Sequence, residues 1–198
     1  MKDSYWFTVL FILLLSVVLS AALGFTNHYY KPVIEANEAR AEKKAILDAL
    51  ALDTTGTPEE IETNFTRYVS LIEQDERRIY ARLDDAGAVD GYAVPFSGTG
   101  LWGAIHGYLA VTADFKTILG VVFTEQNETP GLGGRIDEVA FRDQFRGLDI
   151  GSGSALTYGA ASGGKIDAIA GATSTSVAVL TILNRLIEQD LPELGVLP

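Results

Sequence analysis

The sequence predicts an α+β protein in which an N-terminal transmembrane helix is followed by an antiparallel-sheet domain flanked by helices. Three observations support this fold class. Residues 5 to 25 form an apolar run without a charged side chain. Between residues 79 and 124, short segments of strand character are separated by turn residues. Segments with apolar residues at three- and four-residue intervals precede and follow this region. Successive strands with helices on both sides are typical of α+β domains.

Composition excludes several classes of function. The net charge of −11 argues against nucleic-acid binding, because contacts with phosphates need a basic surface. The chain has no cysteine, which excludes disulfides, thiolate nucleophiles and cysteine-ligated iron–sulfur or zinc sites within it. Its 198 residues suffice for one domain with a short appendage.

The apolar run near the N-terminus predicts a single membrane span, since about 20 such residues cross a bilayer as a helix. Aromatic residues flank the run at both ends, as expected at membrane interfaces. A cleaved signal peptide is the alternative, because Ser20-Ala21-Ala22 offers small residues for cleavage. We favour a retained anchor, since the run exceeds an ordinary signal-peptide core and only Lys2 and Asp3 are charged before it.

The chain is expected to comprise three parts. Residues 1–30 form the membrane anchor, residues 31–78 a helical stalk or docking segment, and residues 79–198 the ligand-binding domain. The stalk contains a predicted helix over residues 33–52, which is rich in Ala, Glu and Lys. Pro32 suits the start of this helix, because a proline is tolerated in the first turn.

A second stalk helix is predicted to begin at Thr57-Pro58-Glu59-Glu60. Thr57 is the expected N-cap, Pro58 the first helical residue and Glu60 the partner that completes a capping box. The charged run at residues 73–78 is interpreted as a solvated face of this segment.

The domain is predicted to contain an antiparallel meander. Its strands are separated by turns of Asp, Gly and Ala at regular spacing. The expected strands cover residues 79–83, 89–94, 105–111 and 117–124. A further short strand is expected at residues 165–169, while residues 151–154 read as a loop and residues 157–164 as a weak strand or more loop.

Two glycine-rich loops within this domain carry bulky apolar residues. The first, Gly98–Gly103, contains Leu101 and Trp102, and is either a turn around a buried Trp or a wall for a flat aromatic ligand. The second, Glu128–Gly134, contains Leu132, and is either a simple connection or an apolar cover for a ring beside polar groups.

The chain then presents four consecutive hydroxyl residues, Thr173 to Ser176, directly after Gly171-Ala172. The apolar spacing from Val179 onward predicts a helix that begins near Ser176. The amide N–H groups and the positive dipole end of a helix N-terminus suit a phosphate. An ordinary N-cap by Ser176 is the alternative, although four hydroxyls exceed what a cap needs.

These motifs resemble the FMN-binding domain family, which includes the C subunit of the sodium-translocating NADH:quinone reductase and the G subunit of the Rnf complex. Ala170-Gly171-Ala172-Thr173 followed by Ser is similar to its (Ser/Thr)-Gly-Ala-Thr-(Ser/Thr) signature, with Ala170 as a departure from the usual Ser or Thr. Residues 128–133, Glu-Thr-Pro-Gly-Leu-Gly, match its second signature. Gly98-Thr99-Gly100-Leu101-Trp102 resembles the quinone-reductase branch, and residues 141–145 fall where the family has a short helix.

The resemblance implies that the domain at residues 79–198 binds FMN covalently, through a phosphoester with the Thr173 hydroxyl. The other expected FMN contacts lie in the three motifs. They are Gly171, Ala172, Ser174 and Thr175 around the phosphate, Leu101, Trp102 and Leu132 against the ring, Glu128 and Thr129 at its polar edge, and Gly131 and Gly133 in the second loop. The resemblance also suggests that Asp167 helps to hold a metal while the flavin is attached.

The implied function is that of a membrane-anchored electron carrier in an ion-translocating oxidoreductase, with little activity of its own. Its expected partners are integral-membrane subunits, membrane lipid and a flavin transferase. The protein is expected in the bacterial inner membrane, with its domain on the extracytoplasmic side. A flavin-binding sensor or maturation protein outside an ion pump, and a structural subunit whose hydroxyls only cap a helix, are the alternatives.

A self-contained hydrolytic centre is not expected. The two histidines, His28 and His106, lie at the end of the membrane segment and inside a predicted strand. A serine hydrolase needs a base aimed at its nucleophile, and a zinc site needs several ligands at suitable spacing. The sequence offers neither pattern, so no catalytic residue and no resident metal site are assigned.

Overall fold

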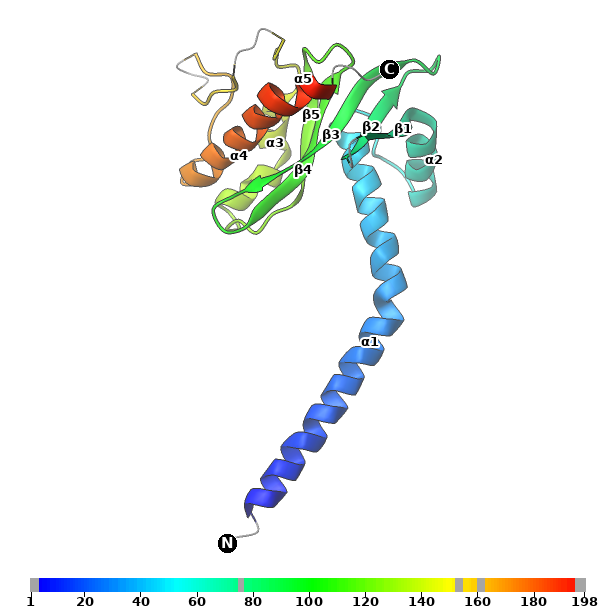
Figure 1. Ribbon diagram of the computed structural model, residues 1–198, viewed down its shortest axis with the longest axis vertical. Coiled ribbons are helices and arrows are strands. Elements are labelled where there is room, and N and C mark those ends of the chain that lie inside the picture. Colours follow the sequence, from blue (N-terminus) through cyan, green and yellow to red (C-terminus); the bar gives the residue numbers. More distant parts are fainter. Residues whose placement is uncertain (1–3, 75–76, 152–154, 160–162, 195–198) are drawn as a thin grey trace. The chain divides into compact units, whose positions relative to one another are not determined.

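The computed structural model describes residues 4–74, 77–151, 155–159 and 163–194. The chain divides into two units, Met1–Ala41 and Glu42–Pro198. The first unit is the larger part of helix α1 (Ser4–Ala49), and the second contains the end of that helix and all other elements (Figure 1).

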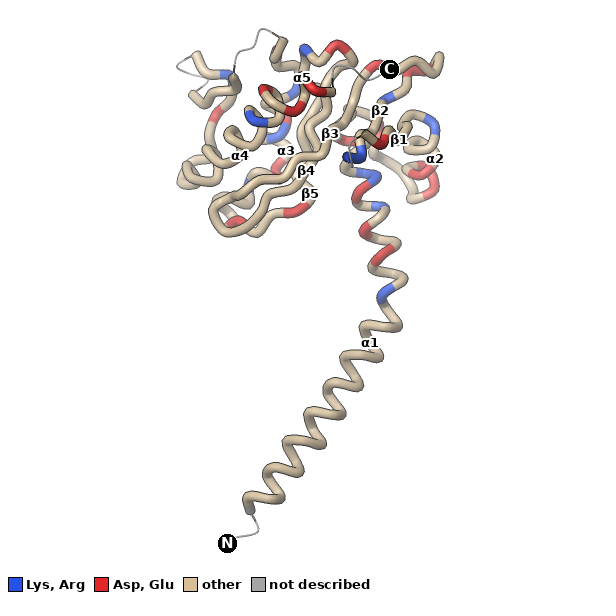
Figure 2. The backbone as a smooth tube through the Cα atoms, in the orientation of Figure 1, with Lys and Arg blue, Asp and Glu red and all other residues tan. Residues whose placement is uncertain are grey.

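Helix α1 is uncharged over its first part, since no Lys, Arg, Asp or Glu occurs from residue 4 to residue 30 (Figure 2). Within the described residues it is the one helix long and apolar enough to cross a membrane. The expectation that a separate helix starts beside Pro32 is wrong, because Pro32 lies inside α1. A proline removes one intrahelical hydrogen bond and bends a helix without necessarily ending it.

Helix α2 (Pro58–Tyr68) begins with the predicted capping box. The Glu60 N–H donates to Thr57 Oγ1 at 3.3 Å, and the Thr57 N–H donates to Glu60 Oε2 at 2.6 Å. The expected helical face at residues 73–78 is wrong for the described residues of this run, because residues 73–74 belong to β1 (Val69–Gln74) and residues 77–78 to β2 (Arg77–Leu83). Glu73 lies opposite Arg78 in the register of these two strands, so both residues belong to the sheet and not to a helix face.

The five strands form one antiparallel sheet in the order β1-β2-β3-β4-β5, with β3 (Val89–Thr99), β4 (Ala104–Thr112) and β5 (Ile118–Glu125). The predicted meander and the α+β class are therefore confirmed. Every connection is a hairpin between neighbours, which needs no long crossover.

Both faces of the sheet are covered, because successive residues of the strands point to opposite sides. Ile79 and Ala81 belong to the larger core, whereas Tyr80 between them belongs to the smaller one. The larger core includes side chains of α4, η4 and α5 on one face. The smaller core includes Ile46 and Leu50 near the end of α1, with residues of α2 packed against it on the other face.

The elements after β5 are short until α4. They are η1 (Gly133–Asp137), α3 (Val139–Arg142) and η2 (Asp143–Phe145), then α4 (Thr173–Arg185), η4 (Leu186–Asp190) and α5 (Leu191–Leu194). Helix α4 packs closely on β3, since a Cβ at Gly98 would lie 2.3 Å from Ile182 Cγ1.

The expected strand at residues 165–169 is wrong. Ile166 makes only an isolated parallel bridge with Tyr158, because this segment runs beside an irregular loop and not beside the sheet. Residues 152–154 and 160–162, which fall in the expected loop and weak strand, lie outside the described residues.

Candidate functional site

Helix α4 begins at Thr173, three residues earlier than the sequence predicts. Its N-cap is Ala172, and no side chain makes a capping hydrogen bond there. The Ser176 hydroxyl instead lies buried and accepts from the Ile169 N–H at 3.1 Å. The ordinary N-cap interpretation therefore fails, and the positive end of α4 is left without a side-chain acceptor.

The four hydroxyl residues divide into two pairs. Thr173 and Ser174 are exposed, whereas Thr175 and Ser176 are buried. Gly171, two residues before Thr173, has a φ of 77°, which a glycine adopts without strain. This turn presents the Thr173 hydroxyl to solvent at the first residue of the helix.

The second signature loop lies against this turn. A Cβ at Gly171 would be 3.2 Å from Leu132 Cδ2, so the Leu132 side chain approaches the turn closely. The loop bends because Gly131 has a φ of 75° and because the Thr129 carbonyl accepts from both the Leu132 and the Gly134 N–H. Leu132 is nevertheless 44% exposed, which is costly for an apolar side chain without a ligand or partner.

The turn between β3 and β4 carries Leu101 and Trp102, which are 55% and 69% exposed. The interpretation of this loop as a turn around a buried Trp is therefore wrong. The Gly100 N–H donates to the Gly103 carbonyl at 2.7 Å and closes the turn, so both large side chains are displayed on a tight loop. Exposed aromatic and aliphatic groups of this kind mark a surface that takes an apolar ligand or partner.

Glu128 brings the three motifs together. Its Oε1 accepts from the Leu101 N–H at 2.7 Å and from the Trp102 N–H at 3.0 Å. Its Oε2 accepts from the Thr175 hydroxyl at 2.5 Å. The side chain of Glu128 is only 4% exposed, so this carboxylate lies beneath the loops and not at their surface.

Two expected roles differ from what the structure shows. The Thr175 hydroxyl is directed to Glu128 and is buried, so it is not presented to a phosphate. The Glu128 carboxylate is engaged by the chain itself and not displayed to a ring edge. Thr129 is exposed on the same loop, and Gly133 is buried beside Thr175.

Two supporting residues were missed from the sequence. Gln126 accepts from the Glu128 N–H at 2.6 Å and donates to Asp137 at 2.9 Å, which fixes the start of the second loop. Tyr158 donates its hydroxyl to the Ser176 carbonyl at 2.8 Å, and burial raises the pKa of Tyr158 above its ordinary value. Neither residue lies in one of the three motifs, and the partners Asp137 and Ser176 lie 11 and 18 residues away in the sequence.

A shallow cavity of about 270 Å³ adjoins the signature on its N-terminal side. Asp167 and Ala170 line it together with Arg135 and Gln144. Asp167 is exposed, and its N–H donates to Gln144 Oε1 at 2.7 Å. The expected role of Asp167 in holding a metal during flavin attachment stays a prediction.

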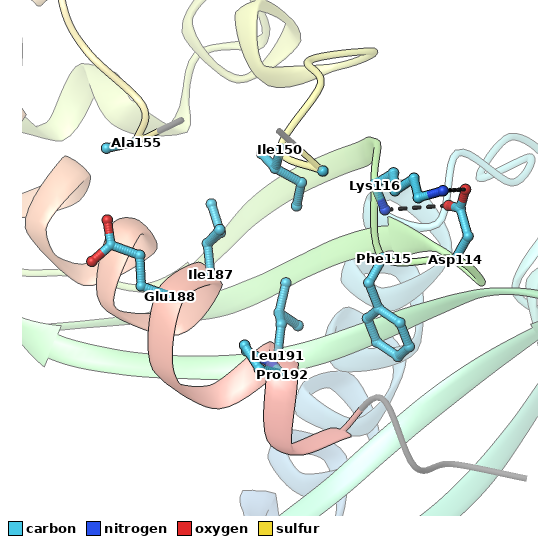
Figure 3. Close-up of a pocket in the computed structure, with 10 residues that line it drawn as sticks. Asp114, Phe115, Lys116, Ile150, Ala155, Ile187, Glu188, Leu191 and Pro192 are labelled. Atoms are coloured by element: carbon cyan, nitrogen blue, oxygen red, sulfur yellow. Dashed lines mark hydrogen bonds and ion pairs between the residues drawn. The ribbon is translucent and has the colours of Figure 1, made fainter. Parts of the chain in front are cut away.

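A larger cavity of about 460 Å³ lies elsewhere in the fold (Figure 3). Phe115 and Lys116 of the β4–β5 turn line it, with Ile150, Ile187 and Leu191. Leu101 and Trp102 lie on the turn at the other end of β4, so this cavity is separate from the three motifs. We therefore assign the ligand site to the motif cluster, which comprises residues 98–103, 128–134 and 170–176, although the cavity beside it is smaller.

Comparison with known proteins identifies the family of this chain. Residues 100–188 match the FMN-binding domain. The G subunit of the ion-translocating oxidoreductase complex of Methanosarcina acetivorans is 31% identical over 95% of this chain and 96% of its own length. The chain belongs to the FMN-binding domain family. The C subunit of the Na(+)-translocating NADH-quinone reductase of Pasteurella multocida is 28% identical over 90% of this chain and 88% of its own length.

Solved structures of this family share the fold. The NqrC crystal structure from Shewanella oneidensis superposes with a TM-score of 0.69 and 24% identity, covering 77% of this chain and 93% of that one. The C subunit of the Na(+)-translocating NADH-quinone reductase from Parabacteroides distasonis gives a TM-score of 0.63 at 26% identity, covering 79% of this chain and 93% of that one.

FMN is the cofactor of this family, and the motif cluster offers suitable groups for both its phosphate and its ring system. The exposed hydroxyls at the uncapped start of α4 suit a phosphate, because a helix N-terminus offers N–H donors and a positive dipole. The exposed side chains of Leu101, Trp102 and Leu132 suit a flat ring system.

Proposed function

We propose that this chain is a membrane-anchored electron-transfer subunit that carries FMN on the Thr173 hydroxyl through a phosphoester. The observation that carries the proposal is the exposed Thr173 side chain at the uncapped N-terminus of α4, inside a matching signature. The similar proteins from Pasteurella multocida and Methanosarcina acetivorans support a place in an ion-translocating complex of NADH:quinone reductase or Rnf type.

The chain's own residues would bind and orient the cofactor. The first N–H groups of α4 and the Ser174 hydroxyl would hold the phosphate, and Gly171 and Ala172 leave it room. Leu101, Trp102 and Leu132 would cover the ring and exclude water, while Thr129 is an exposed polar residue of the same loop as Leu132. When bound, FMN supplies the redox chemistry.

Attachment would need a second protein. Forming a bond between Thr173 Oγ1 and the phosphorus of FMN would break the bond from that phosphorus to a leaving group, such as the nucleoside monophosphate of a flavin dinucleotide substrate, and the hydroxyl proton would pass to a base. We propose that a flavin transferase supplies this base and the flavin substrate, since a hydroxyl is a weak nucleophile until a general base activates it.

The membrane segment would tether this carrier beside its redox partners. Helix α1 has the length and the uncharged composition of a span, which supports a retained anchor. We place the domain on the extracytoplasmic side of the bacterial inner membrane, where a covalent bond would prevent loss of the cofactor. A flavin on a tethered domain passes electrons only to close neighbours, so the isolated chain would show little activity.

The proposal is tested by Thr173→Ala in the full chain, expressed with a flavin transferase. The fluorescent flavin band of denatured protein on a gel should disappear, while the fold persists, because an exposed hydroxyl at a helix start contributes about 1 kcal/mol or less. Thr181→Ala is the matched control, because Thr181 is an exposed threonine of the same helix without a proposed role in binding, and it should keep the band. A band that survives Thr173→Ala would show that the flavin is attached elsewhere.

A further inference from the structure

Glu128 is the one buried carboxylate among the described residues, and it lies where the three motifs meet. Its hydrogen-bond partners come from positions 26, 27 and 47 residues away in the sequence. One oxygen holds two consecutive amides of the β3–β4 turn, and the other holds a hydroxyl in the first turn of α4. A single side chain thus joins the loop that displays Leu101 and Trp102 to the helix that begins at Thr173.

These hydrogen bonds are strong ones. Bonds to an ionised acceptor are roughly twice as strong as neutral ones, and a buried carboxylate has no water to compete with its donors. Leu101 and Trp102 have exposed side chains, so packing does little to hold their turn. Their backbone amides on Glu128 Oε1 therefore supply much of its attachment to the rest of the domain.

Two glycines of the motifs make room for this carboxylate. A Cβ at Gly100 would lie 2.5 Å from Glu128 Oε1. A Cβ at Gly133 would lie 2.5 Å from Thr175 Oγ1 and 2.8 Å from Glu128 Oε2. Since real Cβ atoms do not approach so closely, both glycines are needed for the carboxylate to reach its partners, whatever else they do for a ligand.

The backbone of Glu128 is itself held in place. Its N–H donates to Gln126 Oε1 at 2.6 Å, and Gln126 Nε2 donates to Asp137 of η1 at 2.9 Å. The carboxylate therefore extends from an anchored backbone, which lets it act as a fixed point for the turn and for the helix.

We propose that Glu128 is a positioning residue, whose buried carboxylate sets the place of Leu101 and Trp102 relative to the helix that carries Thr173. This inference rests on the proposed function, which supplies the flavin. Glu128 would act on that flavin only through Leu101, Trp102 and the helix that carries Thr173. Loss of the carboxylate would release the β3–β4 turn, so that the ring loses its apolar cover while the Thr173 bond remains.

The test compares Glu128→Ala, Glu128→Gln and Glu125→Gln in the full chain, expressed with a flavin transferase and purified in detergent. Glu125, at the end of β5, is exposed and controls for the loss of one negative charge on the same segment. Glutamine keeps one oxygen for the two amides, and its NH₂ group can donate to the Thr175 hydroxyl, so it serves as the conservative rescue.

Two measurements follow each variant. Hydrogen exchange at the Leu101 and Trp102 amides should be at least about tenfold faster in Glu128→Ala and close to wild type in the two Gln variants, because the alanine variant loses two charge-assisted hydrogen bonds. Quenching of the flavin fluorescence by iodide should increase several-fold in Glu128→Ala alone. The denatured flavin band should remain in all three.

The outcomes separate the two proposals. A wild-type chain without a flavin band overturns the proposed function and this inference with it. A normal band with unchanged amide exchange or unchanged iodide quenching in Glu128→Ala overturns the positioning role alone. Should Glu128→Ala fail to fold, Thr175→Val removes the donor to Oε2 without adding volume, and unchanged iodide quenching in that variant overturns the proposed link to α4.

Discussion

The end of α1 is attached to the domain by Asp48, and Asp48→Ala should destabilise the second unit substantially. Asp48 Oδ2 pairs with Arg142 Nη1 at 2.5 Å, and Asp48 Oδ1 pairs with Arg146 Nη2 at 2.8 Å. The side chains are only 15% exposed for Arg142 and about 30% for Arg146 and Asp48. Removing the carboxylate therefore leaves Arg142, partly out of water, without the carboxylate it pairs with, and leaves Arg146 with its weaker, more exposed pair to Asp143.

The magnitude follows from this partial burial. Breaking a fully buried pair costs roughly 3–5 kcal/mol, whereas an exposed pair contributes about 0–1 kcal/mol. Arg146 also keeps two backbone acceptors, the Leu119 carbonyl at 2.9 Å and the Asp48 carbonyl at 3.1 Å. Arg142 keeps the Asp137 carbonyl at 3.1 Å. We therefore expect a loss of about 2 kcal/mol of unfolding free energy, which lies between the two limits.

The assay is thermal unfolding of the full chain in detergent, followed by the near-ultraviolet circular dichroism of its tyrosines. A loss of about 2 kcal/mol should lower the Tm by roughly 4–8 °C for a domain of this size. Asp143→Ala is the matched control, since Asp143 also pairs with Arg146 at 3.0 Å but is 54% exposed. Equal Tm values for Asp48→Ala and Asp143→Ala would refute the reasoning from burial.

Two further predictions concern the sheet. Burial, followed by the hydrogen bond to Glu42, raises the pKa of Tyr108 above its ordinary value of 10.0, so the unfolded chain loses this proton first. The unfolding free energy should therefore fall as the pH rises above about 10, and it should fall by less in Tyr108→Phe. Denaturant titrations at successive pH values would measure this, and an equal decrease of unfolding free energy with pH in both proteins would contradict it. Gly98→Ala should lower the free energy of unfolding by about 1–3 kcal/mol, because its Cβ would lie 2.3 Å from Ile182 Cγ1. Adding Ile182→Ala to the same chain should restore part of this free energy, as measured by urea unfolding. Strictly additive effects would show that the two residues do not collide.

Local patterns in the sequence were sufficient for most of the fold. The apolar helix of α1, the capping box of α2 and the strands from Ile79 to Thr124 depend on periodicity and on turn residues within short windows, and all are present in the structure. The patterns failed at β1 and at residues 165–169. In the sequence, the charged edge strand β1 resembles a solvated helix face, and the apolar residues at 165–169 resemble a strand. Only the neighbours of each segment in space distinguish these cases.

The sequence by itself also determined which residues form the candidate site, because its three motifs carry glycines, hydroxyls and large apolar side chains in a family pattern. Only the tertiary structure decided their roles. Thr173 and Ser174 face outward while Thr175 and Ser176 face inward, because the start of α4 is set by packing against the sheet and not by a cap. Glu128 lies beneath the loops because its partners are brought to it by the hairpin of β3 and β4 and by α4, contacts that span up to 47 residues and leave no local trace in the sequence.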